Sequence, residues 1–252
     1  MDISLLHQHI NTLLQSSAIK DYCPNGLQVQ GKTEVQKIVT GVTASQALID
    51  HAITEKADAI LVHHGFFWKS ESPTITGMKY HRIKALLDHN INLLAYHLPL
   101  DVHPELGNNA QLAKLLGIEV TGLVEANNPF SVVVKGQLPE AMLATNFNHL
   151  ISEKLQRPAL HIASRSEKKI KTVAWCTGGG QGYIELAAEQ GIDAFISGEA
   201  SEQTTHVARE MDIHFFAAGH HATERYGVKA LGEYLAKQFS LDVSFIDIDN
   251  PV

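Results

Sequence analysis

The sequence predicts an α/β protein made of two related, closely packed and intertwined lobes with mainly parallel sheets. Two observations support this fold class: short apolar runs alternate with helical stretches, and the same order of landmarks occurs twice in 252 residues. Alternating strands and helices are typical of right-handed βαβ crossovers, which build parallel sheets. Because 44% of the residues are hydrophobic, a chain of this length can bury a sizeable core.

The duplication is visible when residues 37–62 are set beside residues 171–196. Each segment has a Lys-led apolar run ending near Thr, a helical stretch, and an Asp-Ala step into a second strand. A repeat with so many shared landmarks indicates an internal duplication. We therefore expect a first lobe over residues 1–125 and a second over residues 126–252.

Further elements follow from local patterns. Apolar runs without clean alternation predict strands covered by helices on both faces. Helices are expected at 5–16, 45–56, 79–89, 140–156, 181–190 and 224–238, and strands at 37–43, 57–62, 91–96, 131–136, 160–163, 171–177, 191–196 and 214–219. The Asp21–Gly26 segment, with Pro24 and Asn25-Gly26, predicts a turn.

Composition excludes several classes of protein. A formal net charge of −7 disfavours a nucleic-acid backbone as the main partner, because such binding needs clustered Lys and Arg. The two cysteines, Cys23 and Cys176, are too few for a disulfide framework. Neither a signal peptide nor an apolar run long enough to span a membrane is evident, so we expect a cytoplasmic protein with no membrane partner.

Histidines and carboxylates gather where three of the predicted strands end. His63-His64 follows one apolar run, and two others are followed by a histidine four residues before an acid, His97 to Asp101 and His220 to Glu224. In parallel sheets, functional groups collect beyond the carboxyl ends of the strands. Nitrogen and oxygen donors suit hard or borderline metal ions, so the first hypothesis is a metal site in the cleft between the lobes.

Two other features leave alternatives open. Thr223 is a plausible helix N-cap, which would make Glu224 a first-turn residue that interacts with the helix dipole rather than a ligand. The glycines of a strand-to-helix turn, Gly178, Gly179 and Gly180, fit equally a tight structural turn and an anion cradle. Their spacing matches neither a dinucleotide fingerprint nor a Walker motif.

The donor set is larger than one tetrahedral zinc takes from a protein. It suits two divalent ions with a bridging carboxylate, which would activate water for hydrolysis at neutral pH. Without thiolate ligands, Zn, Mn, Fe, Co and Ni all remain open.

The chain resembles the NIF-three-like dinuclear-metal family, the type 2 GTP cyclohydrolase I homologues, in its short bacterial form. The resemblance covers essentially the whole chain and is carried by six motifs: Asp21 to Leu27, Val62 to Gly65, His97 to Asp101, Gly107 to Asn109, Ser197 to Glu199 and Gly219 to Glu224. It implies two ions held by His63, His64, Asp101, His220 and Glu224, with Glu224 as the bridge. It also implies a toroidal homohexamer.

The resemblance leaves His97, Glu199 and His221 beside the ligands, where one could orient water or move a proton as a catalytic group. The expected function is a dinuclear metal-dependent hydrolase acting on a nucleotide or related small phosphorylated compound. The alternative is a metal-binding regulatory or scaffold protein without catalytic turnover.

Overall fold

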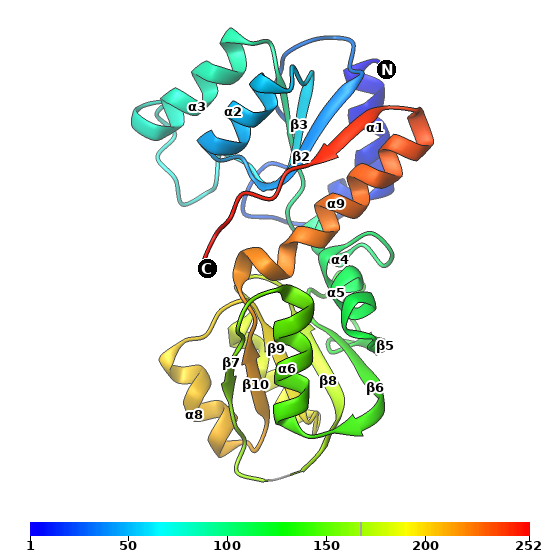
Figure 1. Cartoon of the computed structure of the whole chain (residues 1–252), viewed down its shortest axis with the longest axis vertical. Coiled ribbons are helices and arrows are strands. Elements are labelled where there is room, and N and C mark those ends of the chain that lie inside the picture. The colour runs from blue at the N-terminus through cyan, green and yellow to red at the C-terminus, as the bar shows by residue number, and fades with distance from the viewer. Residues whose placement is uncertain (167) are drawn as a thin grey trace. The chain divides into compact units, whose positions relative to one another are not determined.

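The computed structural model describes residues 1–166 and 168–252, which fold into two compact units. Unit 1 comprises residues 1–107 and 227–249, and unit 2 comprises residues 108–226 and 250–252. Each unit is a sheet with helices on its faces, which confirms the α/β class (Figure 1). Unlike the continuous lobes expected from the sequence, the units exchange segments, because helix α9 (His220–Phe239) begins in unit 2 and ends in unit 1.

Unit 1 contains a five-stranded sheet in the order β1-β4-β3-β2-β11. Only the edge strand β1 runs antiparallel to its neighbour; the other pairs are parallel. The strands are β1 (Gly26–Val29), β2 (Lys37–Thr43), β3 (Ala59–His64), β4 (Asn92–Ala95) and β11 (Asp242–Phe245). The helices are α1 (Ile3–Leu13), η1 (Ser16–Ala18), α2 (Gln46–Thr54), α3 (Gly77–Asp88) and α4 (Leu98–Val102).

Two apolar clusters hold these layers of unit 1 together. One joins α2 and α3 to the sheet through residues such as Leu48 and Leu86, and the other joins α1 and the end of α9 through residues such as Leu6 and Leu235. Figure 1 shows α2 and α3 on one side of β2 and β3, with α1 and α9 on the other. Burial on both faces explains why the strands lack polar alternation.

Unit 2 contains a six-stranded sheet in the order β5-β6-β8-β9-β10-β7, in which only β8, β9 and β10 are parallel. The strands are β5 (Glu119–Leu123), β6 (Val134–Met142), β7 (Leu160–Ile162), β8 (Ile170–Cys176), β9 (Ala194–Ser197) and β10 (His214–Ala217). The helices are α5 (Asn108–Leu116), α6 (Ala144–Leu155), η2 (Gln181–Tyr183), α7 (Ile184–Glu189) and α8 (Glu202–Glu210). The cores lie between the sheet and α5 with α6, and between the sheet and α7 with α8.

The duplication is preserved in the strand register. Ala59 of β3 pairs with Ile38 and Asn92, and Ala194 of β9 pairs with Val173 and His214, so the three parallel strands of each unit match. Within the described ranges, no helix combines the length and apolar character needed to cross a membrane.

The start of β2 and the start of β8 are held in the same way. The Asp58 carboxylate accepts the backbone N–H of Lys37 at 3.0 Å, and the Asp193 carboxylate accepts that of Lys171 at 3.0 Å. The aspartate of each Asp-Ala step in the sequence therefore stabilises the start of a neighbouring strand, since its carboxylate accepts a backbone N–H that the sheet leaves unpaired.

Candidate metal-binding residues

In unit 1, two histidines at the end of β3 and one carboxylate of α4 form a donor group. His63 is fully buried, and its Nδ1 lies 3.0 Å from the carbonyl oxygen of Tyr96. Because a carbonyl can only accept, Nδ1 carries the proton and Nε2 offers a lone pair. That Nε2 lies 3.6 Å from Oδ1 of Asp101. His64 is anchored similarly, with Nδ1 3.2 Å from Oγ1 of Thr43.

His97 lies beside this group but has a different carboxylate partner. Its Nδ1 is 2.7 Å from Oδ1 of Asp21, and its backbone N–H donates to Oδ1 of Asn25 at 2.7 Å. Nitrogen atoms of His63, His64 and His97 lie within 4.8 Å of one another, a spacing that could hold a metal ion. Burial opposes the charge on Asp21, but its bonds to His97, Asn25 and the Tyr22 amide outweigh burial and lower the pKa of Asp21 to about 2.

Asp21 and Asn25 were not expected to contact His97. The two segments are more than 70 residues apart, and no local pattern reports such a contact. The sequence held one indication of this contact: Asp21 and Asn25 belong to the Asp21–Leu27 motif, and a turn alone would not require a carboxylate.

In unit 2, His220 stands between two carboxylates. Its Nδ1 lies 2.7 Å from Oε1 of Glu199, and its Nε2 lies 3.2 Å from Oε2 of Glu224, one helical turn further along α9. Burial alone would lower the pKa of His220, but the bonds to Glu224 and Glu199 outweigh it and raise this pKa to about 9. A cation is therefore favoured at this position, as a proton or as a metal ion that replaces it.

The expected N-cap at Thr223 is wrong. Helix α9 begins at His220, four residues earlier than a Thr223 cap would place it, directly after Gly219, which has a φ of +99°. Thr223 lies inside the helix, where its hydroxyl donates to the carbonyl of Gly219 and accepts the N–H of Gly178 at 3.0 Å. The earlier start places His220 and Glu224 on one face of the helix.

Gly178 lies directly against these donors. With a φ of +64°, it passes so close to α9 that a Cβ there would stand 2.0 Å from Oε1 of Glu224. Its amide donates to Thr223, and its carbonyl accepts from Gly198 and Ser197. The amide that an anion cradle would need at Gly178 is thus already bonded, and the residue leaves room for Glu224.

The other glycines of the turn and His221 have different surroundings. A Cβ at Gly179 would stand 3.8 Å from Cε1 of His220, whereas one at Gly180 would collide with Sγ of Cys176 at 2.4 Å. His221 is buried, and its backbone N–H donates to the carbonyl of Val252.

The donor geometry within each unit fits a divalent cation. Ligands bound at about 2.1 Å around one ion lie about 3.0–3.4 Å apart, close to the observed 3.2 Å and 3.6 Å between histidine nitrogen and carboxylate oxygen. In His63 and His220, Nδ1 is held by an oxygen acceptor while Nε2 faces the carboxylate, the arrangement found around metal-ligating histidines.

Comparison with known proteins identifies the family. A model of the Duf34/NIF3 (NGG1p interacting factor 3) family matches residues 1–251. The chain belongs to this family. The NIF-three-like resemblance seen in the sequence motifs is therefore confirmed.

Relatives in the Duf34/NIF3 family are similar over nearly their whole length. A Haemophilus influenzae protein called "GTP cyclohydrolase 1 type 2 homolog" is 63% identical over 246 residues, covering 98% of each chain. A solved structure described as protein ybgI of unknown function has a TM-score of 0.96 at 56% identity, with both chains fully covered. The structure of TTHA1606 from Thermus thermophilus has a TM-score of 0.89 at 32% identity, also with full coverage of both chains.

Proposed function

We propose that this protein is a dinuclear metal-dependent hydrolase acting on a nucleotide or a related small phosphorylated compound. The observation that carries the proposal is the paired arrangement in each unit: a histidine anchored through Nδ1 faces a carboxylate through Nε2. Histidines that serve only as hydrogen-bonding groups have no need to face a carboxylate in this orientation in both units. Metal binding requires this orientation, because ligating imidazoles must keep one nitrogen unprotonated.

The proposed ligands come from both units: His63, His64 and Asp101 from unit 1, and His220 and Glu224 from unit 2. Three donors and two donors are each too few to fill the coordination of two ions. The five residues together would hold both ions, with Glu224 shared between them as the family resemblance implies. Two divalent ions, of Zn, Mn, Fe, Co or Ni, would supply Lewis acidity and an activated water.

His97 and Glu199 have the contacts needed for supporting roles. A proton on Nδ1 of His97 faces the ionised carboxylate of Asp21, so Nε2 can accept a proton during hydrolysis. Glu199 fixes the orientation of His220 through Nδ1. His221 is a third candidate for a supporting role, on the resemblance alone.

The nucleotide substrate is proposed from the printed name of the relatives, GTP cyclohydrolase 1 type 2 homolog. The family resemblance also leads us to propose a toroidal homohexamer in the cytoplasm. Light scattering coupled to size-exclusion chromatography tests the assembly: a mass of six chains supports it, and a monomer contradicts it.

Steady-state assays over a nucleotide panel with each of the five metals test the hydrolase. We expect turnover that disappears on chelation and in the variants Asp101→Ala and Glu224→Ala. Turnover that survives in both variants would overturn a metal mechanism. Tight metal binding without turnover on any nucleotide would instead favour the regulatory or scaffold alternative.

A further inference from the structure

Two loops of unit 1 are joined into one rim beside His97. The backbone N–H of Lys69 donates to the carbonyl of Tyr22 at 2.8 Å, and its ammonium donates to the carbonyl of Asp21 at 2.5 Å. The Gln28 side chain accepts from the backbone of Phe66 at 2.7 Å and donates back to it at 3.1 Å. Because Asp21 also holds His97, the rim is fixed relative to the donor group of unit 1.

Tyr22 is the exposed aromatic side chain of the first loop. It is 61% exposed, whereas the following residue, Cys23, is buried. The polar neighbours Asp21 and Asn25 direct their side chains inward to His97, so the turn presents the Tyr22 ring outward. That ring lies 6.3 Å from the His97 ring, centroid to centroid.

Trp68 of the second loop approaches the same histidine. Its ring lies 4.9 Å from the His97 ring at an interplanar angle of 82°, and 5.8 Å from the His64 ring. Its indole N–H donates to the carbonyl of Gly65, which fixes the orientation of the partly exposed ring. A single exposed aromatic residue is common on protein surfaces. Two aromatic rings around one histidine of a donor group form a more specific arrangement.

Lys69 adds positive charge to the rim. Lys69 is exposed, and one of the three N–H groups of its ammonium donates to the Asp21 carbonyl. The remaining donors can bind an anionic group. The rim therefore combines aromatic surface with a cation, next to histidines suited to a metal ion.

We propose that the rim of Tyr22, Trp68 and Lys69 binds an anionic compound that contains a planar ring. The ring stacks on the two aromatic side chains, and its anionic group contacts the Lys69 ammonium. This inference rests on the proposed hydrolase for the site's location and narrows its substrate to ring-containing anions. It makes these three side chains specificity determinants rather than catalytic residues.

Calorimetric titration of the metal-loaded full chain with GTP, ATP and inorganic tripolyphosphate separates the contribution of ring stacking to affinity from that of the anionic group. Replacing Tyr22 by Ala should weaken binding of both nucleotides about tenfold, through lost stacking. Binding of tripolyphosphate should not change in Tyr22→Ala and should weaken in Lys69→Ala. Tyr22→Phe should keep wild-type affinity, because the phenyl ring preserves the stacking surface.

The control is Tyr80→Ala on α3, which removes another exposed tyrosine, one whose ring contacts His81 rather than His97. It should bind all three probes as the wild type does. Nucleotide affinity unchanged in Tyr22→Ala, or wild-type protein that binds tripolyphosphate as tightly as GTP, would overturn the proposal. Ring-dependent binding without hydrolysis would support the rim while contradicting the proposed hydrolase.

Discussion

Asn92 and His214 occupy the same position in the two duplicated sheets, and each side chain accepts a backbone N–H from the segment after the edge strand, one through an amide and the other through an imidazole. Each begins the strand that pairs with an antiparallel edge strand, β1 or β7. Oδ1 of Asn92 accepts the N–H of Gly31 at 2.8 Å, and Nδ1 of His214 accepts the N–H of Ser164 at 3.3 Å. Both donors follow the edge strand. An amide keeps this role at any pH, whereas an imidazole loses it when protonated.

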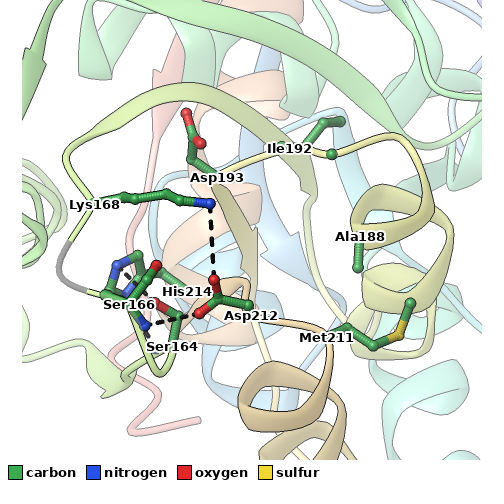
Figure 2. A pocket seen from close by; sticks show the side chains of 10 residues that line it. Ser164, Ser166, Lys168, Ala188, Ile192, Asp193, Met211, Asp212 and His214 are labelled. Atoms are coloured by element: carbon green, nitrogen blue, oxygen red, sulfur yellow. Dashed lines mark hydrogen bonds and ion pairs between the residues drawn. The ribbon is translucent and has the colours of Figure 1, made fainter.

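The surroundings of His214 keep its ring neutral. Nδ1 also accepts from the ring Nε2–H of His161 at 3.1 Å, and Nε2 lies 3.2 Å from the Ser164 hydroxyl. Burial lowers the pKa of both histidines. Repulsion by a charged His214 lowers the pKa of His161 further. At His214, a hydrogen bond to the Lys168 backbone and the charges of Asp212 and Asp193 offset part of the effect of burial on its pKa. His214 lines a pocket of about 140 Å³ together with Lys168, Asp193 and Asp212. Figure 2 shows these side chains around the pocket.

We predict that unfolding free energy falls on acidification because of this pair. A histidine whose folded pKa is lowered binds its proton more readily in the unfolded chain, so its contribution is complete above pH 6.5 and is lost as pH falls toward the folded pKa. The variant His214→Asn, which copies Asn92, should show a smaller decrease between pH 7 and about pH 5 in urea denaturation. The control His51→Asn, at an exposed histidine, should show the same dependence of unfolding free energy on pH as the wild type. If His214→Asn also showed the wild-type dependence, the acid sensitivity would not come from His214.

Gly178→Ala should disturb the donors of unit 2. The new Cβ would collide with the Glu224 carboxylate, and a left-handed φ costs a non-glycine residue about 1–2 kcal/mol. We expect a lower melting temperature and reduced bound metal by mass spectrometry of the purified protein. Gly182→Ala is the matched control, since nothing lies within 4 Å of a Cβ there. Full metal content in Gly178→Ala would show that Glu224 is not a ligand.

Glu199→Gln should weaken metal binding without unfolding the protein. The carboxylate of Glu199 orients His220 through a 2.7 Å contact, and loss of such partners costs about 10–100-fold in metal affinity. Competition with a chromophoric chelator measures that affinity. Glu202→Gln, on the exposed start of α8, should bind metal like the wild type. Equal affinity in both variants would remove Glu199 from the site.

The repeated sequence pattern was sufficient to predict the three duplicated parallel strands of each unit and the residues at their ends, but not the parallel edge strand β11. His97 and His220 align in the duplication, yet only His220 faces its own acid; His97 faces Asp21, and His63 faces Asp101 instead. The duplication alone would have treated both histidines alike. Side-chain pairing depends on neighbours distant in sequence, which a local pattern does not contain.

Other departures have physical causes of the same kind. The strands β1, β5 and β11 are edge strands of four or five residues and were not expected, because at most two residues of each are buried and their apolar pattern is weak. The early start of α9 depends on the conformation of Gly219, and the exchange of segments between units depends on the length of that helix. The start of α9 and the exchange of segments both depend on the folded chain and are not encoded in a local sequence pattern.

Anomalous diffraction from crystals grown with Mn²⁺ or Zn²⁺ would show directly whether the five proposed ligands bind metal ions. We expect two ions per chain, each bonded at about 2.0–2.3 Å to donors among His63, His64, Asp101, His220 and Glu224. Ions bound elsewhere, or these five side chains left without a metal at saturating concentration, would contradict this expectation.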